Sequence, residues 1–351
     1  MGVTGRAGQG SVERLTEARV DQLLDAARTT RVLVVGDLML DRYISGVVER
    51  VSPEAPVPVV RVEQESSAVG GAGNVAANVA ALGAICQVVG LAGRDEAGAA
   101  MRLELEKLGV RTEGMVLTDA RPTTLKTRIL ARRQQIVRFD NEVEADADGA
   151  LARQLADTVE TLGAESDVVI MEDYNKGVLV PEVIERALEV AAARGLPSVV
   201  DPKRRNFFAY RGATVFKPNA KELEDALGAF IHPSHAGWME ETRNKLQARH
   251  LLLTLGERGM ALQTENGDLV QVPAAARGVY DVSGAGDTVT AVVATMLAAG
   301  ATIQEAAWLA NHAAAIEVGK PGVATVSPEE LRAHVRSSAA AVGARQPSHS
   351  S

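Results

Sequence analysis

Short apolar segments alternate with longer helical patterns along most of this 351-residue chain. The segments at 31–40, 85–93 and 166–174 are rich in β-branched and other apolar residues, as is typical of buried strands. Helical patterns that end on glycine follow at 70–83 and 181–195. Repeated strand–helix units place their strands side by side, so we predict an α/β fold with a central, mostly parallel sheet and helices on both faces.

Two segments interrupt this alternation, because they contain strand patterns without helices. They lie at about residues 41–66 and 111–142. Within the second, the stretch at 123–140 alternates apolar and polar residues on either side of "RRQQ", which predicts a hairpin with one polar face. We expect both segments to form a small β-sheet lid that stands off the main sheet.

The pattern divides the chain into one main domain and two ends. We predict an N-terminal tail and leading helix at 1–30, the α/β domain at 31–335 and a C-terminal tail at 336–351. The first residues, "MGVTGRAGQGSVERL", lack the apolar core of a secretory signal, and no apolar run reaches the roughly 18 residues that suggest a membrane-spanning helix.

Charge and cysteine content limit the partners and the compartment. A net charge of −8 argues against nonspecific nucleic-acid binding, which needs a basic surface. Cys86 is the only cysteine, so an intrachain disulfide is impossible and a reducing environment fits. We predict a cytoplasmic protein with neither nucleic-acid nor membrane partners.

The stretch "YDVSGAGDTVTAVV" begins at Tyr280 and combines a glycine turn with the start of an apolar helix. Unpaired N–H groups at Gly284, Ala285 and Gly286, together with the helix dipole, would form an anion site. Asp287 beside that site could take a proton from an attacking hydroxyl. The alternative is an ordinary turn with an acidic residue in the first helical turn, which the dipole also favours.

A second glycine-rich stretch, "GGAGNVAANVA", begins at Gly70. Its spacing matches the dinucleotide fingerprint, and Asp95 follows at about the distance of the ribose-binding acid, so an NAD(P)-dependent oxidoreductase is one alternative. However, this fingerprint should follow the first core strand, which ends earlier in the chain. The other possibilities are that Gly70, Gly71 and Asn74 approach a polar ligand, or that the small residues serve close helix packing.

Polar residues also follow other predicted strands. Asp37 and Asp41 come after the first strand, where carboxylates can accept hydrogen bonds from sugar hydroxyls or simply be solvated. Asn219 and Glu222 resemble a capping box, and the alternative is that they hold phosphates and Mg²⁺, directly or through water. The residues predicted on the nucleotide side are Asn219, Glu222, Lys217, Thr254, Gly256 and Gly259.

Four cations stand out in this acidic chain. Lys126, Arg128 and Arg138 gather on the predicted hairpin, and Lys176 lies at a strand end. Converging cations suit a phosphate that the substrate already carries. The alternative is a solvated hairpin face, the usual place of such charges.

Together these motifs resemble those of the ribokinase-like carbohydrate kinases, the PfkB family, over about residues 31–330. The family's two signatures are similar to "GGAGNVAANVAALGA" and "DVSGAGDTVTAVV", and no Walker A motif is present. The resemblance implies a ribokinase-like fold, ATP and Mg²⁺ as cofactors, and phosphorylation of a carbohydrate.

Within the family, "SPEAPVPVV" and "RRQQIVRFD" look most like the heptose 7-phosphate kinases of lipopolysaccharide-precursor synthesis. This resemblance implies phosphorylation of D-glycero-β-D-manno-heptose 7-phosphate at its anomeric hydroxyl to the 1,7-bisphosphate. Many such relatives carry a second, nucleotidyltransferase domain, and we expect another protein to supply that step here. A kinase for another sugar or sugar phosphate, and a non-catalytic sugar sensor on a kinase fold, are the remaining alternatives.

The resemblance also assigns roles to residues. Asp287 matches the catalytic base, Gly284, Ala285 and Gly286 match the anion hole, and Asp281 and Ser283 match a monovalent-cation site that would take K⁺. Glu222 matches the Mg²⁺ region. Relatives commonly have threonine at the position of Ser283 and "GGAAN" in place of "GGAGN". The predicted sugar-side residues are Asp37, Asp41, Gly70, Gly71, Asn74, Lys126, Arg128, Arg138, Asp173 and Lys176. Exposed strand edges on the lid predict a homodimer formed through it.

Overall fold

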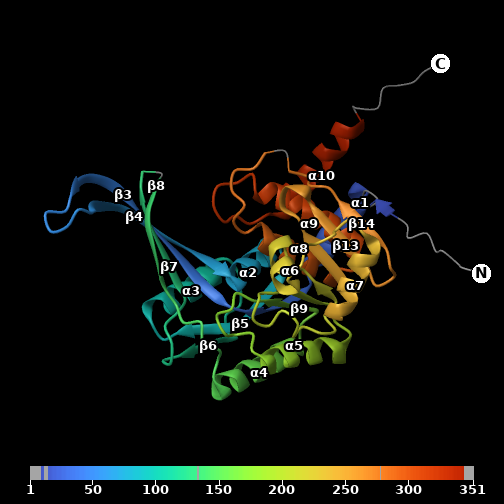
Figure 1. Cartoon of the computed structure of the whole chain (residues 1–351), viewed down its shortest axis with the longest axis horizontal. Helices are drawn as coiled ribbons and strands as arrows, with labels where there is room; N and C mark the ends of the chain where they lie inside the picture. The colour runs from blue at the N-terminus through green and yellow to red at the C-terminus, as the bar shows by residue number, and fades with distance from the viewer. Residues whose placement is uncertain (1–8, 12–14, 133, 277, 344–351) are drawn as a thin grey trace, which may run out of the picture.

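The computed structural model describes residues 9–11, 15–132, 134–276 and 278–343. A ten-stranded sheet runs through the molecule in the order β1-β14-β13-β12-β11-β10-β9-β2-β5-β6 (Figure 1). All neighbouring strands pair in parallel except at β13, which is antiparallel to both neighbours. The strands are β1 (Gln9–Ser11), β2 (Arg31–Gly36), β5 (Ile85–Gly93), β6 (Met115–Thr118), β9 (Val168–Glu172), β10 (Ser198–Asp201), β11 (Val215–Phe216), β12 (His250–Thr254), β13 (Met260–Gln263) and β14 (Leu269–Val272).

Helices cover both faces of this sheet, which confirms the predicted fold class. One apolar core packs six helices against one face: α1 (Glu17–Ala27), α2 (Ala72–Ala81), α3 (Glu96–Lys107), α8 (Ala285–Ala298), α9 (Ile303–Glu317) and α10 (Pro328–Gly343). A second core packs four helices against the other: α4 (Gly149–Gly163), α5 (Pro181–Arg194), α6 (Ala220–Leu227) and α7 (Ala236–Leu246). The strands between these layers are buried on both sides, because helices replace solvent on each face.

A smaller four-stranded sheet has the order β4-β3-β7-β8 and stands away from the large sheet (Figure 1). It consists of β3 (Leu38–Val51), β4 (Pro58–Gly71), β7 (Leu125–Ala131) and β8 (Gln134–Asn141). β3 and β7 pair in parallel, and each also forms an antiparallel hairpin with its outer neighbour. β6, inside the segment expected at 111–142, differs from the prediction because it pairs with β5 in the large sheet.

Gly71 joins the smaller sheet to α2 and can only be glycine there. Its φ is +57°, in the region that side chains disfavour, and a Cβ at this position would lie 2.4 Å from the Asp37 carbonyl oxygen. The Ala72 N–H donates to the same oxygen at 3.0 Å. The glycine-rich stretch therefore fixes the start of α2 against the end of the first core strand.

Parts of both predicted end segments form regular elements within the described ranges. Gln9–Ser11 pair with β14, and α10 extends past residue 336 to Gly343. Arg332 ties α10 to α1 through ion pairs with Asp21 at 2.7 Å and Asp25 at 3.0 Å. Within the described ranges, none of the helices has the length and apolar character needed to span a membrane.

Candidate active site

The N-terminus of α8 forms the centre of the candidate active site. Gly284 is its N-cap residue with φ +96°, and a Cβ there would lie 3.1 Å from Asn74 Nδ2. The Ala285 N–H makes a long contact of 3.5 Å with the Val282 carbonyl, and the first N–H groups of a helix have no intrahelical acceptor. The free N–H groups and the positive end of the helix dipole therefore both face outward from the N-terminus of α8, as an anion site requires.

Asp287 lies in the first turn of α8 and is only 7% exposed. The Asn74 amide donates to its Oδ2 at 2.7 Å, and the Tyr174 hydroxyl donates to its Oδ1 at 3.0 Å. Burial raises the pKa of Asp287 to about 6, although both hydrogen bonds act in the opposite direction. A carboxylate that is held in place and has a pKa close to neutrality is suited to accept a proton from a substrate hydroxyl.

Two carboxyl groups that the sequence did not single out lie beside Asp287. Glu172 ends β9, Asp201 ends β10, and carboxylate oxygens of these two residues and Asp287 lie within 4.8 Å of one another. Both Glu172 oxygens are buried and have no hydrogen-bond partner among the described residues. Burial and then the charges of Asp201 and Asp287 raise the pKa of Glu172.

Two lysines partly balance this negative charge. Lys217 Nζ lies 2.7 Å from Asp201, and both side chains are almost fully buried. Lys203, another residue that the sequence did not identify, forms an ion pair with Glu222. Burial lowers the pKa of Lys203, but Asp201 and Glu222 outweigh burial and raise it. The lysines remain charged and can face the phosphates of a nucleotide.

Three residues predicted for the nucleotide side, Asn219, Glu222 and Thr254, lie close to one another at the start of α6. Asn219 and Glu222 form the capping box of α6, with side-chain to main-chain distances of 2.8 Å in both directions. Thr254 lies alongside Asn219 in a parallel bridge. Both Glu222 oxygens are engaged, so contact with Mg²⁺ through water preserves the cap, whereas direct coordination would break a contact.

Gly256 begins a short 3₁₀ turn (Gly256–Arg258) shortly after Thr254, and Gly259 directly follows this turn. Gly256 has φ +60° and open space where a Cβ would lie. A Cβ at Gly259 would lie 2.1 Å from the Val272 carbonyl oxygen. The first glycine therefore meets a requirement for positive φ in the turn, whereas the second permits close packing of two chain segments.

On the sugar side, Asp41 lies at the base of the smaller sheet and forms an ion pair with Arg128. Asp41 is 7% exposed, and the position of a Cβ on Gly70 would be 2.7 Å from its Oδ2. The Arg128 guanidinium also lies over the Tyr43 ring, 5.3 Å from its centre. Gly70 thus admits the carboxylate close to the main chain, where it can face a sugar hydroxyl.

Asp37 and Asp173, two of the predicted sugar-side residues, are held by hydrogen bonds within the protein. Three N–H groups, from Tyr174, Lys176 and Val178, donate to the Asp37 carboxylate at 2.7–3.0 Å. The Tyr210 hydroxyl donates to Asp173 at 2.8 Å, and burial raises the pKa of Asp173 to about 6. Since both carboxylates are almost completely buried, they shape the loop after β9 rather than present open acceptors.

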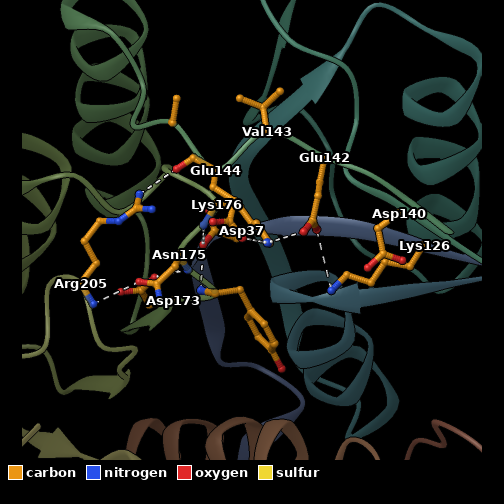
Figure 2. A network of polar contacts seen from close by, with 12 residues as sticks. Asp37, Lys126, Asp140, Glu142, Val143, Glu144, Asp173, Asn175, Lys176 and Arg205 are labelled. Carbon is orange, nitrogen blue, oxygen red and sulfur yellow. Dashed lines mark hydrogen bonds and ion pairs between the residues drawn. The ribbon is translucent and has the colours of Figure 1, made fainter. Parts of the chain in front are cut away.

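The remaining predicted cations all have carboxylate partners. Lys176 Nζ lies 2.7 Å from Glu142 and 2.8 Å from Glu144, and Lys126 Nζ lies 3.9 Å from Glu142 (Figure 2). Arg138 pairs with Asp140 at 3.0 Å. The sequence pointed to these cations but not to their partners Glu142 and Glu144. These carboxylates reach Lys176 only because the chain after β8 lies beside the loop that follows β9.

The turn before α8 contains the pair predicted to bind a monovalent cation. The Ser283 N–H donates to Asp281 at 2.9 Å, and hydrogen bonds from Ser283 lower the pKa of Asp281. Glu317 faces the same turn: it is fully buried, and its Oε1 lies 3.3 Å from the position that a Cβ on Gly284 would take. Burial, followed by Asp281 and Asp287, raises the pKa of Glu317 to about 8.

Asp95 has a structural role that argues against a dinucleotide site. It caps α3 by accepting from the Gly98 N–H at 2.8 Å, and it also accepts from the Thr123 N–H and hydroxyl. The glycines of the fingerprint follow β4 of the smaller sheet rather than β2. The oxidoreductase alternative therefore lacks both a free acid to bind the ribose and a core strand directly before the glycines.

The α/β fold with a second sheet, the helix start with free N–H groups and the buried carboxylate beside it together fit a sugar kinase. Residues 29–330 match the model of the pfkB family carbohydrate kinases, and the chain belongs to this family. Membership of this family makes the chain an ATP-dependent sugar kinase, as the two signature motifs predicted.

Relatives and solved structures support this placement. The bifunctional protein HldE of Citrifermentans bemidjiense is 44% identical over 318 residues, covering 90% of this chain and 65% of the relative. That of Caulobacter vibrioides is 47% identical over 308 residues, covering 86% of this chain and 62% of the relative. The chain thus spans less than two thirds of the length of these relatives.

The fold is shared with more distant kinases. Phosphofructokinase-2 from Escherichia coli in complex with potassium superposes with a TM-score of 0.72 at 20% identity, covering 88% of this chain and 99% of that one. Arabidopsis thaliana ribokinase complexed with ribose and ATP gives a TM-score of 0.68 at 19% identity, with the same coverage. At these identities the likeness concerns the fold alone.

Proposed function

We propose that this kinase phosphorylates the anomeric hydroxyl of D-glycero-β-D-manno-heptose 7-phosphate, with Asp287 as the general base. The observation that carries the reaction is the placement of Asp287: a buried carboxylate, oriented by Asn74 and Tyr174, in the first turn of the helix that offers free N–H groups. The finer choice of sugar rests on the sequence resemblance to heptose 7-phosphate kinases.

Transfer proceeds in line from ATP to the sugar. Asp287 accepts the proton of the attacking hydroxyl, while the N–H groups of Gly284, Ala285 and Gly286 hold the transferring phosphoryl group. Tyr174 remains a hydrogen-bond donor, because burial and the charge of Asp287 raise its pKa. The first turn of α8 thus combines proton acceptance and charge stabilisation within one rigid element.

The carboxylate cluster also fits a magnesium ion. Oxygen ligands are those that Mg²⁺ prefers, and the unpartnered oxygens of Glu172 beside Asp201 leave buried acceptors that a cation would satisfy. When bound, Mg²⁺ neutralises charge on the phosphates. Glu222 would reach it through water, and Lys217 and Lys203 would face the same phosphates. We assign the turn at Asp281 and Ser283 to K⁺.

We place the phosphate of the sugar at cations of the smaller sheet and of the loop after β9. Asp41 and Asn74 would face sugar hydroxyls, and Lys126, Arg128 and Lys176 would surround the 7-phosphate. We further propose that the smaller sheet acts as a lid that excludes water from the transfer. Its strands display exposed apolar side chains, including Val62 and Phe139 at 49% and 52% exposure, which a second copy would cover in a cytoplasmic homodimer.

A panel of sugars tests this function. The purified protein is incubated with ATP, Mg²⁺ and one sugar at a time, and phosphorus NMR locates the new phosphate. We expect an anomeric phosphate on the heptose 7-phosphate and much weaker turnover of the unphosphorylated heptose. Preferred turnover of another phosphosugar would support a different kinase specificity, and phosphorylation away from the anomeric carbon would contradict the proposed acceptor position.

A further inference from the structure

We propose that Glu142 is an internal substitute for the substrate's phosphate, which occupies the site between Lys126 and Lys176 until a phosphorylated sugar displaces it. This proposal rests on the proposed function, because it assumes that these two lysines receive the sugar phosphate. It assigns a role in specificity to a residue that is absent from the family signatures. Glu142 directly follows the end of β8 at Asn141.

The geometry around Glu142 is that of an anion held by two cations. Its Oε1 lies 2.7 Å from Lys176 Nζ, and its Oε2 lies 3.9 Å from Lys126 Nζ (Figure 2). The three side chains are largely buried, with exposed fractions of 10–20%. Glu144 gives Lys176 a second carboxylate partner at 2.8 Å, so departure of Glu142 would leave the two lysines with one carboxylate and an excess of positive charge.

The fit of Glu142 is incomplete. Its Oε2 is buried but has no hydrogen-bond partner among the described residues, since 3.9 Å to Lys126 is too long for one. A phosphate carries more acceptor oxygens and up to two negative charges, so it can bond to both lysines at once. The lysines therefore gain more from a phosphate than from the carboxylate that it replaces.

The main chain on either side of Glu142 is fixed, so its departure requires only a side-chain rotation. Before it, Asn141 pairs with Leu125 in the smaller sheet. After it, Arg121 donates to the Val143 carbonyl at 3.3 Å and Arg205 donates to the Glu144 carbonyl at 2.8 Å. A ligand without phosphate would leave Glu142 in place, whereas a phosphosugar would release it to solvent.

Phosphate binding to the full-length protein tests this role. Calorimetric titration with inorganic phosphate at constant ionic strength compares wild type, Glu142→Gln and Glu144→Gln. Glu144 is the matched control, because it also pairs with Lys176 but is 62% exposed and has no ion pair with Lys126 among the described contacts. We expect Glu142→Gln to tighten phosphate binding about fivefold, which corresponds to ~1 kcal/mol, and Glu144→Gln to change it less than about twofold.

Glu142→Asp provides a second variant if the glutamine protein is unstable. The shorter side chain retains its charge but loses reach, so intermediate tightening is expected. Unchanged or weaker phosphate binding in both Glu142 variants, or equal tightening in Glu144→Gln, would overturn the proposal. Wild-type turnover separates this outcome from failure of the function: equal kcat/KM for the heptose with and without its phosphate would contradict the phosphosugar assignment, whatever the calorimetry shows.

Discussion

The start of α8 and the inner edge of the smaller sheet treat charge in opposite ways. Around α8, Asp287, Glu172 and Glu317 are buried carboxyl groups whose pKa values are raised, above all by burial. At the smaller sheet, Lys126 and Arg128 are paired with carboxylates. In the first region, burial disfavours the charged form of the carboxyl groups, as suits the proton acceptor proposed there. In the second region, each cation already has a carboxylate partner, which the proposed substrate phosphate would have to replace. This difference predicts that the two regions control different kinetic quantities.

The largest effect is expected when the base is removed. Asp287→Asn keeps the shape of the side chain but cannot accept the hydroxyl proton, so we expect kcat to fall by about 10²–10⁴-fold. Binding of ATP and sugar, measured by calorimetry, should stay close to wild type. Asp268→Asn, at an exposed carboxylate outside the site, is the control. Near-normal turnover of Asp287→Asn would exclude Asp287 as the base.

Removal of the two lysines should act on substrate binding instead. We expect Lys126→Ala combined with Lys176→Ala to raise KM for the phosphosugar by about 10²-fold, because two charge-assisted contacts are lost, and to lower kcat much less. Steady-state kinetics at saturating ATP measures both quantities. A fall in kcat with an unchanged KM would contradict the expectation that the lysines act on substrate binding and α8 on turnover.

The sequence predicted the α8 region in part, because its key features are local. A glycine turn, an apolar helix and Asp287 lie within one stretch, and the structure retains that order. Glu172 and Asp201 were missed because their closeness depends on the pairing of β9 with β10, which adjacent sequence does not show. Their only signal was a carboxylate at each strand end, a common feature in α/β proteins.

At the proposed sugar side, the sequence indicated which residue types are present but not their partners. The cations at 126, 128, 138 and 176 lie where a hairpin and a strand end were expected. Their carboxylate partners arise from tertiary contacts, as does the use of Asp37 to hold three N–H groups of the loop after β9. A sequence motif specifies which groups are present, whereas packing determines which of them remain open to a ligand.

A smaller effect is expected on stability at Glu317. Its pKa rises on folding from the ordinary value of 4.5 to about 8, so its contribution to stability is fully present below about pH 4.5 and is lost as the pH rises towards about 8. Glu317→Gln removes this titration. We expect the difference in Tm, variant minus wild type, to increase by a few degrees between pH 5 and pH 9, as measured by scanning calorimetry. If Tm depended on pH in the same way in both proteins, a raised pKa of Glu317 would be contradicted.

The central claim, that burial prepares Asp287 to act as a base, is tested most directly by the pH dependence of kcat at saturating ATP and sugar. The base must be ionised, and its pKa is raised to about 6. Below that pH, kcat should therefore decrease with a limiting slope of about tenfold per pH unit, and above it kcat should reach a plateau. Phosphate groups of the substrates also titrate near pH 6, so the residual activity of Asp287→Asn serves as reference. We expect the acid limb to disappear in Asp287→Asn, whereas the same limb in both proteins would contradict the role of Asp287 as the base.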